Sequence, residues 1–262
     1  MKMHWMRGMF LGVSLALLVA GVAVAQGPVV AVGILVDSSG SILSPQFDLM
    51  LNGIGAAVED TECIPHDGSV ELSVVQFGTD ESEELEPTVI TSANAASVAT
   101  TIRNISKGGG STNMTEGFMQ MLTTMQSSAN FATTDKQVIN LSTDGDPNSE
   151  VDAVAARDAA ITAGVDEIDA EGIGDLLDVN FLKDEIVYPQ PGHLVDTDGY
   201  VPGWVDTPSD FEEYAAGLCT KFQQIIPEPE EEFVPEPGAV VLLGSGLMGL
   251  AGYATLRLRL RP

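Results

Sequence analysis

Residues 29–36, Val-Val-Ala-Val-Gly-Ile-Leu-Val, followed at 37–41 by Asp-Ser-Ser-Gly-Ser, decide the fold of this chain. The first stretch is apolar throughout, and such an unbroken run is typical of a strand buried on both faces of a parallel sheet. A helix is expected to begin at Ser44, because the proline at position 45 suits the first turn of a helix. A buried strand, a polar loop and a helix together form the opening unit of an α/β fold.

Strand and helix patterns continue to alternate along residues 26–226, which are predicted to form one domain. Apolar runs predict further strands at residues 70–77, 84–90, 137–141 and 165–174. Helical periodicity predicts helices at residues 44–58, 95–105, 115–125 and 150–163. A capping pattern of Ser209 with Glu212 predicts the start of one more helix.

This order predicts a doubly wound, mostly parallel central sheet of the Rossmann-like type, with helices on both faces. Residues 70–77 and 84–90 are expected to be the exception, an antiparallel hairpin at one sheet edge. The pattern is weaker between 175 and 207, where it predicts a short helix at 176–182, a short strand at 186–188 and a long proline-containing loop. In such folds ligands bind at the carboxyl ends of the strands, where the strand order reverses.

Three polar segments are expected to meet at that end of the sheet. The strand at 29–36 runs into the Asp-Ser-Ser-Gly-Ser segment, and the strand at 137–141 runs into Ser-Thr-Asp-Gly-Asp at 142–146. The third segment, Ser-Thr-Asn at 111–113, follows three glycines at 108–110, which would let its backbone approach a ligand closely.

Together these segments resemble the metal-ion-dependent adhesion site of von Willebrand factor A domains. Asp37, Ser39 and Ser41 match its Asp-x-Ser-x-Ser element, Thr112 matches its lone threonine, and Asp144 matches the aspartate of its Thr-Asp-Gly element. The resemblance extends over residues 29–226 and departs at no ligand position. It implies an adhesion-type binding domain that holds Mg²⁺, Mn²⁺ or Ca²⁺ and, through the ion, an aspartate or glutamate of a protein partner. The loop at 189–208 is a candidate for specificity.

The residue types suit that chemistry. Mg²⁺ prefers oxygen ligands in a near-octahedral array and keeps several water molecules. Three hydroxyls and two carboxylates supply mostly neutral donors, which leave the cation electrophilic toward a further carboxylate. Without the ion, Asp37 would crowd Asp144 and raise the pKa of one of them.

The first 25 residues read as a secretory signal peptide. Lys2 and Arg7 form a basic start, residues 9–24 are apolar, and Ala23-Val24-Ala25 is a cleavage site of small residues before Gln26. The competing interpretation is a permanent N-terminal membrane anchor.

The other end carries Pro235-Glu236-Pro237, then an uncharged run at 239–256, then arginines at 257, 259 and 261. Eighteen residues of helix span about 27 Å, enough for a transmembrane helix. Residues 234–262 resemble the PEP-CTERM sorting signal, which implies export by a Gram-negative bacterium, transient anchoring in the inner membrane and cleavage by an exosortase-type protease. The alternative for 239–256 is a buried core helix. Residues 227–237 read as a stiff acidic stalk.

Charge and cysteine content narrow the function further. Residues 26–237 contain all 38 acidic residues and six of the 11 basic ones, a net charge of −32. Such a surface repels nucleic acid, so direct DNA or RNA binding is not expected. Cys63 and Cys219 are expected to form a disulfide in an oxidising compartment, the alternative being two buried free thiols.

Two other functions compete with adhesion. An enzyme, such as a Mg²⁺-dependent phosphoester hydrolase, is disfavoured because the sequence has no nucleophile, zinc or phosphate-loop motif and no lysine or arginine near Asp37 to hold a phosphate. The second is a structural matrix protein that gathers cations through its overall acidity. We therefore predict a binding protein located at the cell surface, in the extracellular matrix or in the medium.

Overall fold

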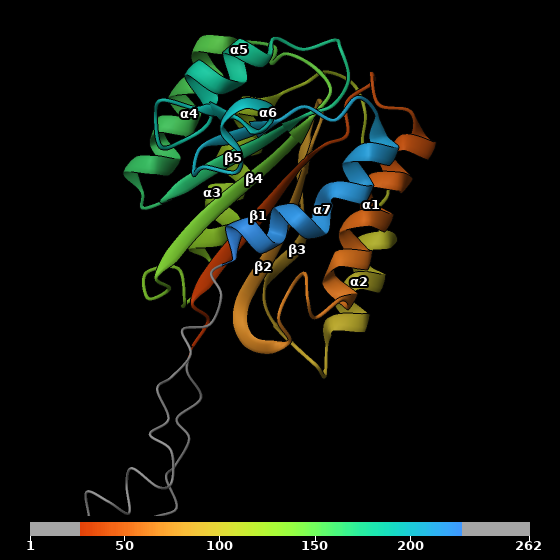
Figure 1. Ribbon diagram of the computed structural model, residues 1–262, viewed down its shortest axis with the longest axis vertical. Coiled ribbons are helices and arrows are strands. Elements are labelled where there is room, and N and C mark those ends of the chain that lie inside the picture. The colour runs from red at the N-terminus through yellow and green to blue at the C-terminus, as the bar shows by residue number, and fades with distance from the viewer. Residues whose placement is uncertain (1–26, 227–262) are drawn as a thin grey trace, which may run out of the picture. The chain divides into compact units, whose positions relative to one another are not determined.

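The computed structural model describes residues 27–226, which form an α/β domain around one central sheet (Figure 1). The predicted signal peptide at 1–25, the stalk at 227–237, the sorting segment at 234–262 and its transmembrane helix at 239–256 lie outside the described residues. None of the helices formed by residues 27–226 combines the length and the hydropathy needed to cross a membrane.

Seven strands of the described chain form the sheet, in the order β3-β2-β1-β4-β5-β7-β6. Their bounds are β1 Val30–Asp37, β2 Asp67–Phe77, β3 Glu81–Thr91, β4 Lys136–Thr143, β5 Glu167–Gly172, β6 His193–Leu194 and β7 Trp204–Asp206. All neighbours are parallel except β2 and β3, which form the expected antiparallel hairpin. The predicted doubly wound, mostly parallel sheet is confirmed.

Helices cover both faces of this sheet. One face carries α1 Ser44–Glu59, α2 Ala95–Arg103 and α7 Phe211–Ile225, and the other carries α3 Met114–Gln126 and α4 Glu150–Thr162 (Figure 1). The short α5 Val179–Phe181 continues into the π-helix η1 Leu182–Ile186, which packs against α4, and α6 Val195–Asp198 packs against β6 and β7.

Every residue of β1 is buried, as its unbroken apolar run predicts. A Cβ at Gly33 would collide with the sulfur of Met121 and lie 3.0 Å from that of Met125. The methionines of α3 are therefore packed directly onto the strand, where their flexible side chains fill the core.

The two cysteines form the expected disulfide. Cys63 and Cys219 are joined with their Cα atoms 4.7 Å apart and 156 positions apart in sequence. The bridge ties the turn that follows α1 to helix α7. These two helices also pack closely, since a Cβ on Gly53 would lie 2.8 Å from Leu218.

The segment from 175 to 207 differs most from its prediction. The helix expected at 176–182 begins only at Val179, and the strand expected at 186–188 is a single bridge between Ile168 and Tyr188. Strands β6 and β7 were not predicted, because two and three residues are too few to show a period. The buried carboxylate of Asp169 positions the start of β7 by accepting hydrogen bonds from the amides of Gly203 and Trp204 at 3.0 Å.

The capping prediction for the last helix was wrong by one residue. Helix α7 begins at Phe211, and the amide of Glu213 donates to the Asp210 carboxylate at 2.8 Å. The Glu213 carboxylate in turn accepts the amide of Ser209 at 2.8 Å. Asp210 thus caps the helix in place of Ser209, and the Glu213 carboxylate binds the residue before the cap.

Candidate metal centre

The predicted ligands lie where the sheet order reverses. Strand β1 pairs with β2 on one side and with β4 on the other, so the loops after β1 and β4 leave the same sheet edge side by side. Asp37 is the last residue of β1, and Asp144 directly follows β4. This position is the ligand-binding crevice expected of a doubly wound sheet.

Asp37 is the most enclosed of the five residues. Its side chain is fully buried, and one oxygen accepts the Ser39 amide at 2.7 Å while the other accepts the Thr143 hydroxyl at 2.7 Å. Thr143 lies 106 positions away and was not among the predicted site residues. Both carboxylate oxygens of Asp37 are therefore oriented before any ligand binds.

The two serines connect this carboxylate to the second one. The hydroxyls of Ser39 and Ser41 lie 3.0 Å apart, and the Ser41 hydroxyl donates to Asp144 Oδ1 at 2.6 Å. Ser39 and Asp144 are buried, whereas Ser41 is exposed. The cluster of polar oxygens thus begins inside the sheet edge and opens to solvent.

Thr112 reaches the cluster from a third loop. Its carbonyl accepts the Asn148 amide at 3.0 Å, and its hydroxyl is 3.7 Å from the place of a Cβ on Gly145, the neighbour of Asp144. Among the described residues, its hydroxyl forms no hydrogen bond with the other four side chains. The structure therefore links Asp37, Ser39, Ser41 and Asp144 through side-chain or amide hydrogen bonds, and places Thr112 beside them through its backbone.

The glycines before Thr112 act as the sequence indicated. Gly110 has a φ of +87°, and its carbonyl accepts the Gly40 amide at 2.8 Å. A side chain at Gly110 would collide with Thr79. Glycine at this position lets the loop after α2 lie directly against the loop after β1.

Burial controls the electrostatics of the site. It raises the pKa of Asp37 to about 6, although hydrogen bonds from Ser39 and Thr143 oppose the shift. Burial also raises the pKa of Asp144, and the hydrogen bond from Ser41 opposes it. Repulsion by Asp144, the cause expected from the sequence, is the smallest contribution at Asp37.

Lys107 is a site residue that sequence reasoning missed. Its ammonium donates to the carbonyls of Ser38 and Ser39 at 2.6 and 2.7 Å, and its charge lowers the pKa of Asp144. The expectation that no basic residue lies near Asp37 was therefore wrong. The available signal was a rare lysine directly before the three glycines. Because its ammonium is bonded to the backbone, Lys107 holds the loop after β1.

The donor set fits a hard divalent cation. Hydroxyl and carboxylate oxygens are the ligands that Mg²⁺ and Ca²⁺ select, and the residues present offer no nitrogen or thiolate donor. Two buried carboxylates with raised pKa values share one edge of the sheet, and within residues 27–226 Lys107 is the basic residue whose charge lowers the pKa of one of them, Asp144. A divalent cation held by Asp37, Ser39, Ser41, Thr112 and Asp144 would compensate that negative charge.

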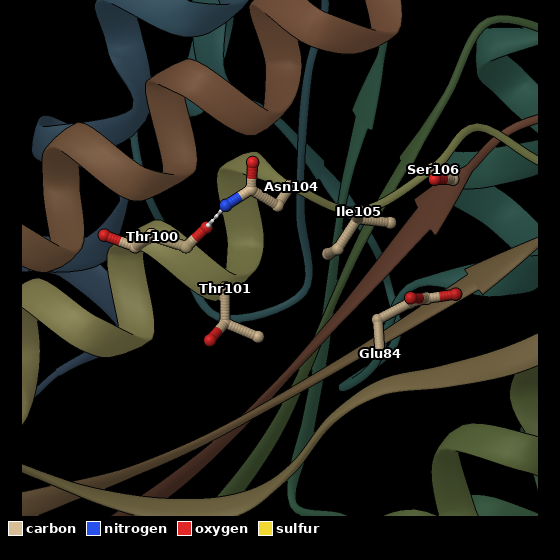
Figure 2. A pocket seen from close by; sticks show the side chains of 6 residues that line it. All are labelled: Glu84, Thr100, Thr101, Asn104, Ile105 and Ser106. Atoms are coloured by element: carbon tan, nitrogen blue, oxygen red, sulfur yellow. Dashed lines mark hydrogen bonds between the residues drawn. The ribbon is translucent and has the colours of Figure 1, made fainter.

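A hollow of about 500 Å³ between α2 and β3 contains none of these five residues (Figure 2). Three of its polar side chains are satisfied by the backbone of α2: Thr100 donates to Ala96 at 2.8 Å, Thr101 to Ser97 at 3.1 Å, and Asn104 to Thr100 at 2.8 Å. The Glu84 carboxylate accepts the hydroxyl of Ser82 at 2.5 Å. These contacts lie within helix α2 and within strand β3, and they leave the metal centre as the better candidate site.

Comparison with known proteins agrees with this architecture. The family model described as von Willebrand factor type A domain matches residues 32–173. No curated protein sequence matches the chain.

Solved structures share the fold at low identity. Proximal thread matrix protein 1 from the mussel byssus is 20% identical with a TM-score of 0.54, over 76% of this chain and 46% of that one. The pilus adhesin SpaC from Lactobacillus rhamnosus GG is 13% identical with a TM-score of 0.56, over 77% and 31%. Manganese-loaded TRAP protein from Plasmodium vivax is 24% identical with a TM-score of 0.50, over 75% and 73%.

The chain spans less than half the length of the byssus protein and of the adhesin. One structure of the byssus protein has a zinc-occupied MIDAS motif. At these identities the likeness shows the fold alone. The match to the family model covers more than half of the 262-residue chain, and on that ground, together with the sheet order and the helices on both faces, the protein belongs to the von Willebrand factor type A domain family.

Proposed function

We propose that this protein is an exported binding protein, and not an enzyme, that holds one divalent cation and through it engages a carboxylate of a protein partner. The observation that supports this most strongly is the convergence of oxygen donors from three loops at the switch point of the sheet. The proposed ligands are Asp37, Ser39, Ser41, Thr112 and Asp144. Mg²⁺ fits this set best, with Mn²⁺ and Ca²⁺ as alternatives.

A bound cation would offer a coordination position that an aspartate or glutamate from another protein can fill. Other residues of this chain orient the two carboxylates before the cation binds. Thr143 and the Ser39 amide orient the carboxylate of Asp37, and Ser41 orients that of Asp144. Pre-oriented donors avoid the cost of ordering them at the moment of binding.

We further propose that the two ends of the chain deliver the domain to the cell surface or the extracellular matrix. The signal peptide at 1–25 would direct export, and the PEP-CTERM-like segment at 234–262 would hold the precursor in the inner membrane until an exosortase-type protease cuts near Pro235-Glu236-Pro237. The fold relatives that are a pilus adhesin and a byssus matrix protein agree with a location outside the cytoplasm. Mass spectrometry of the mature protein tests this: an intact C-terminus ending at Pro262 would contradict it.

A matrix protein that gathers many cations is the second candidate. It is favoured by the net charge of −32 over residues 26–237. The two candidates differ in stoichiometry, because a built site binds one ion tightly and a diffuse acidic surface binds many weakly.

Calorimetric titration with Mg²⁺ separates the two, using the parent protein, Asp144→Asn and the control Asp80→Asn. Asp80 is an exposed carboxylate in the turn between β2 and β3. We expect one binding event in the parent and in the control, and at least about tenfold weaker binding in Asp144→Asn, since even indirect metal contacts are worth that much. Many weak events that are equal in all three proteins would favour the matrix protein instead.

A further inference from the structure

Three potential metal ligands from different elements converge where α1 ends. One carboxylate oxygen of Asp60 and the sulfur atoms of Cys63 and Cys219 all lie within 4.8 Å of one another. Asp60 is the C-cap of α1, Cys63 belongs to the turn that follows, and Cys219 belongs to α7. We call these three residues the Asp60 cluster.

The cluster is separate from the proposed metal centre in place and in chemistry. Ser41 precedes α1 and Asp60 follows it, and the 16 residues of this helix span about 24 Å. The proposed centre offers oxygen donors, which suit Mg²⁺, whereas the cluster adds two sulfur atoms, which select thiophilic cations such as Zn²⁺. The two sites can therefore be distinguished by the metal that each prefers.

The two sulfur atoms are joined in a disulfide, but the protein must pass through a dithiol state. A disulfide forms when an oxidant takes two electrons from two thiols and two protons are released, so the newly made chain carries Cys63 and Cys219 as thiols. A phosphine reverses the step: the phosphorus gives two electrons to the sulfur atoms, and water supplies its oxygen to the phosphine oxide and its two protons to the sulfurs. Both sulfur atoms are then available as ligands.

Contacts other than the disulfide hold the cluster together. The side-chain amide of Gln223, on α7, donates to the carbonyl of Glu62 at 2.9 Å. Within the turn, the Cys63 amide donates to the Asp60 carbonyl at 3.1 Å, and the Glu62 amide donates to Asp60 Oδ1 at 2.9 Å. Helices α1 and α7 also pack closely at Gly53. Reduction by itself therefore leaves the turn against α7, with the ligands already near one another.

The charge around the cluster favours a cation. Helix α1 directs its negative end toward Asp60, and its last turn contains no basic residue. The nearby Arg103 is ion-paired with Glu59 at 2.6 Å, and none of the ion pairs within residues 27–226 involves Asp60. Two thiolates beside this carboxylate would bring three negative charges together, which a divalent cation compensates.

We propose that Asp60, Cys63 and Cys219 form a Zn²⁺ site in the dithiol state of this protein. The ion displaces the proton of each thiol and binds both thiolates and the Asp60 carboxylate, with water as the fourth ligand. Two thiolates at about 2.3 Å from a tetrahedral Zn²⁺ lie about 3.8 Å apart, close to the contact distance that two unbonded sulfur atoms must keep in any case. The ion thus ties the turn after α1 to α7 as the disulfide does, and the domain keeps a crosslink here in both redox states.

Absorption of Co²⁺ tests the site, because thiolate ligands give a charge-transfer band in the near ultraviolet that oxygen ligands do not give. The protein is reduced with a phosphine and titrated with Co²⁺. We expect a band that saturates at one ion per chain and disappears when excess Zn²⁺ is added. The oxidised parent and Cys63→Ser/Cys219→Ser should give no band. A reduced parent without the band would overturn the proposal.

The role of the carboxylate is tested by two matched variants of the reduced protein. Asp60→Asn removes the charge but keeps an oxygen that can accept the Glu62 amide, so the turn is preserved. Glu62→Gln is the control, because Glu62 is an exposed acid of the same turn that lies outside the cluster. We expect Asp60→Asn to bind Co²⁺ at least about tenfold more weakly than the parent, and Glu62→Gln to bind it as the parent does. Equal affinities in the two variants would show that Asp60 is not a ligand and that the proposed site is wrong.

Thermal unfolding with and without Zn²⁺ tests the crosslink. Zn²⁺ should raise the unfolding temperature of the reduced parent more than that of the oxidised parent, in which the cluster has no thiolates to offer. The extra rise should vanish in Cys63→Ser/Cys219→Ser and shrink in Asp60→Asn. An equal rise in both redox states would show that the ion does not crosslink the turn to α7.

Asp144→Asn separates this site from the proposed metal centre. The variant removes a proposed Mg²⁺ ligand at the other end of α1, so the cobalt band of the reduced protein should keep its strength. A band that is lost in Asp144→Asn and kept in Asp60→Asn would place the thiophilic ion away from the cluster and overturn the proposal.

Discussion

The Ser41 hydroxyl donates a hydrogen bond to Asp144 Oδ1 at 2.6 Å, although the two residues are 103 positions apart. One follows β1 and the other follows β4, so this bond joins two loops that meet only because their strands are neighbours in the sheet. The same two side chains are proposed to contact the cation. The bond therefore prepares the spacing of the donors before a metal ion binds.

Replacing Ser41 with alanine should weaken Mg²⁺ binding by at least about tenfold, because it removes one donor and frees the Asp144 carboxylate to rotate. Ser41→Thr keeps the hydroxyl and should bind Mg²⁺ within a few-fold of the parent. Calorimetry on the three proteins measures this. Equal affinities for Ser41→Ala and the parent would remove Ser41 from the ligand set.

The stability of the metal-free protein should fall as the pH rises from about 4 to above 6. Burial raises the pKa of Asp37 from 3.8 to about 6, so the folded protein holds this proton more tightly than the unfolded chain does. The stabilisation is fully present below pH 4 and is lost as the pH passes 6, a change of about 3 kcal/mol.

Thermal unfolding in EDTA across this pH range measures the loss. Asp169 and Glu171 also have raised pKa values from burial and contribute in the same direction. Comparison with Asp37→Asn isolates the part due to Asp37: the variant should lose less stability across the range. A parent and variant with parallel pH profiles would show that Asp37 does not titrate there.

Removing the Cys63–Cys219 disulfide should lower the free energy of unfolding by about 2–5 kcal/mol. The bridge closes a loop of 156 positions, and a crosslink over so long a loop strongly restricts the unfolded chain. Urea unfolding of the Cys63→Ser/Cys219→Ser double variant measures the effect. The parent under reducing conditions should match the variant, and an unchanged midpoint after reduction would contradict this prediction.

Lys221 is a buried cation whose loss should be costly. Its ammonium lies 3.0 Å from Asp206 Oδ2, 3.9 Å from Glu171 Oε1 and 4.9 Å from the centre of the Tyr214 ring. Lys221→Met should lower the free energy of unfolding by about 3 kcal/mol, because it leaves the Glu171 carboxyl buried without a counter-charge.

Adding Glu171→Gln to Lys221→Met should recover part of that loss, since the amide removes the buried charge and can keep a hydrogen bond to Asn140 or Ser142. Lys183→Met is the control, because Lys183 is a partly exposed residue paired with its neighbour Asp184. It should cost less than about 0.5 kcal/mol, as surface substitutions usually do. Equal losses in the single and double variants would show that the Glu171 charge is not the cause.

Periodicity predicted the long elements of the fold well and the short ones poorly. Strand β1 and helix α3 have enough residues for an apolar run or a helical face to show. Strands β6 and β7 have two and three residues, and β7 is positioned in part by hydrogen bonds to Asp169. Asp169 is a charged residue in the buried strand β5, and nothing in the hydrophobic periodicity indicates its hydrogen bonds to β7. The edge of the sheet formed by β7 and β6 therefore could not be predicted.

The sequence by itself determined which oxygen-bearing residues follow the strands, because a buried apolar run that ends in Asp37 or leads to Asp144 is a local pattern. Only the tertiary structure decided that Thr143 orients Asp37 and that Lys107 holds the loop after β1. Those relationships depend on the order and register of strands that are far apart in the chain. A residue's own neighbours in sequence carry no record of that register, since it is set by the packing of the whole sheet.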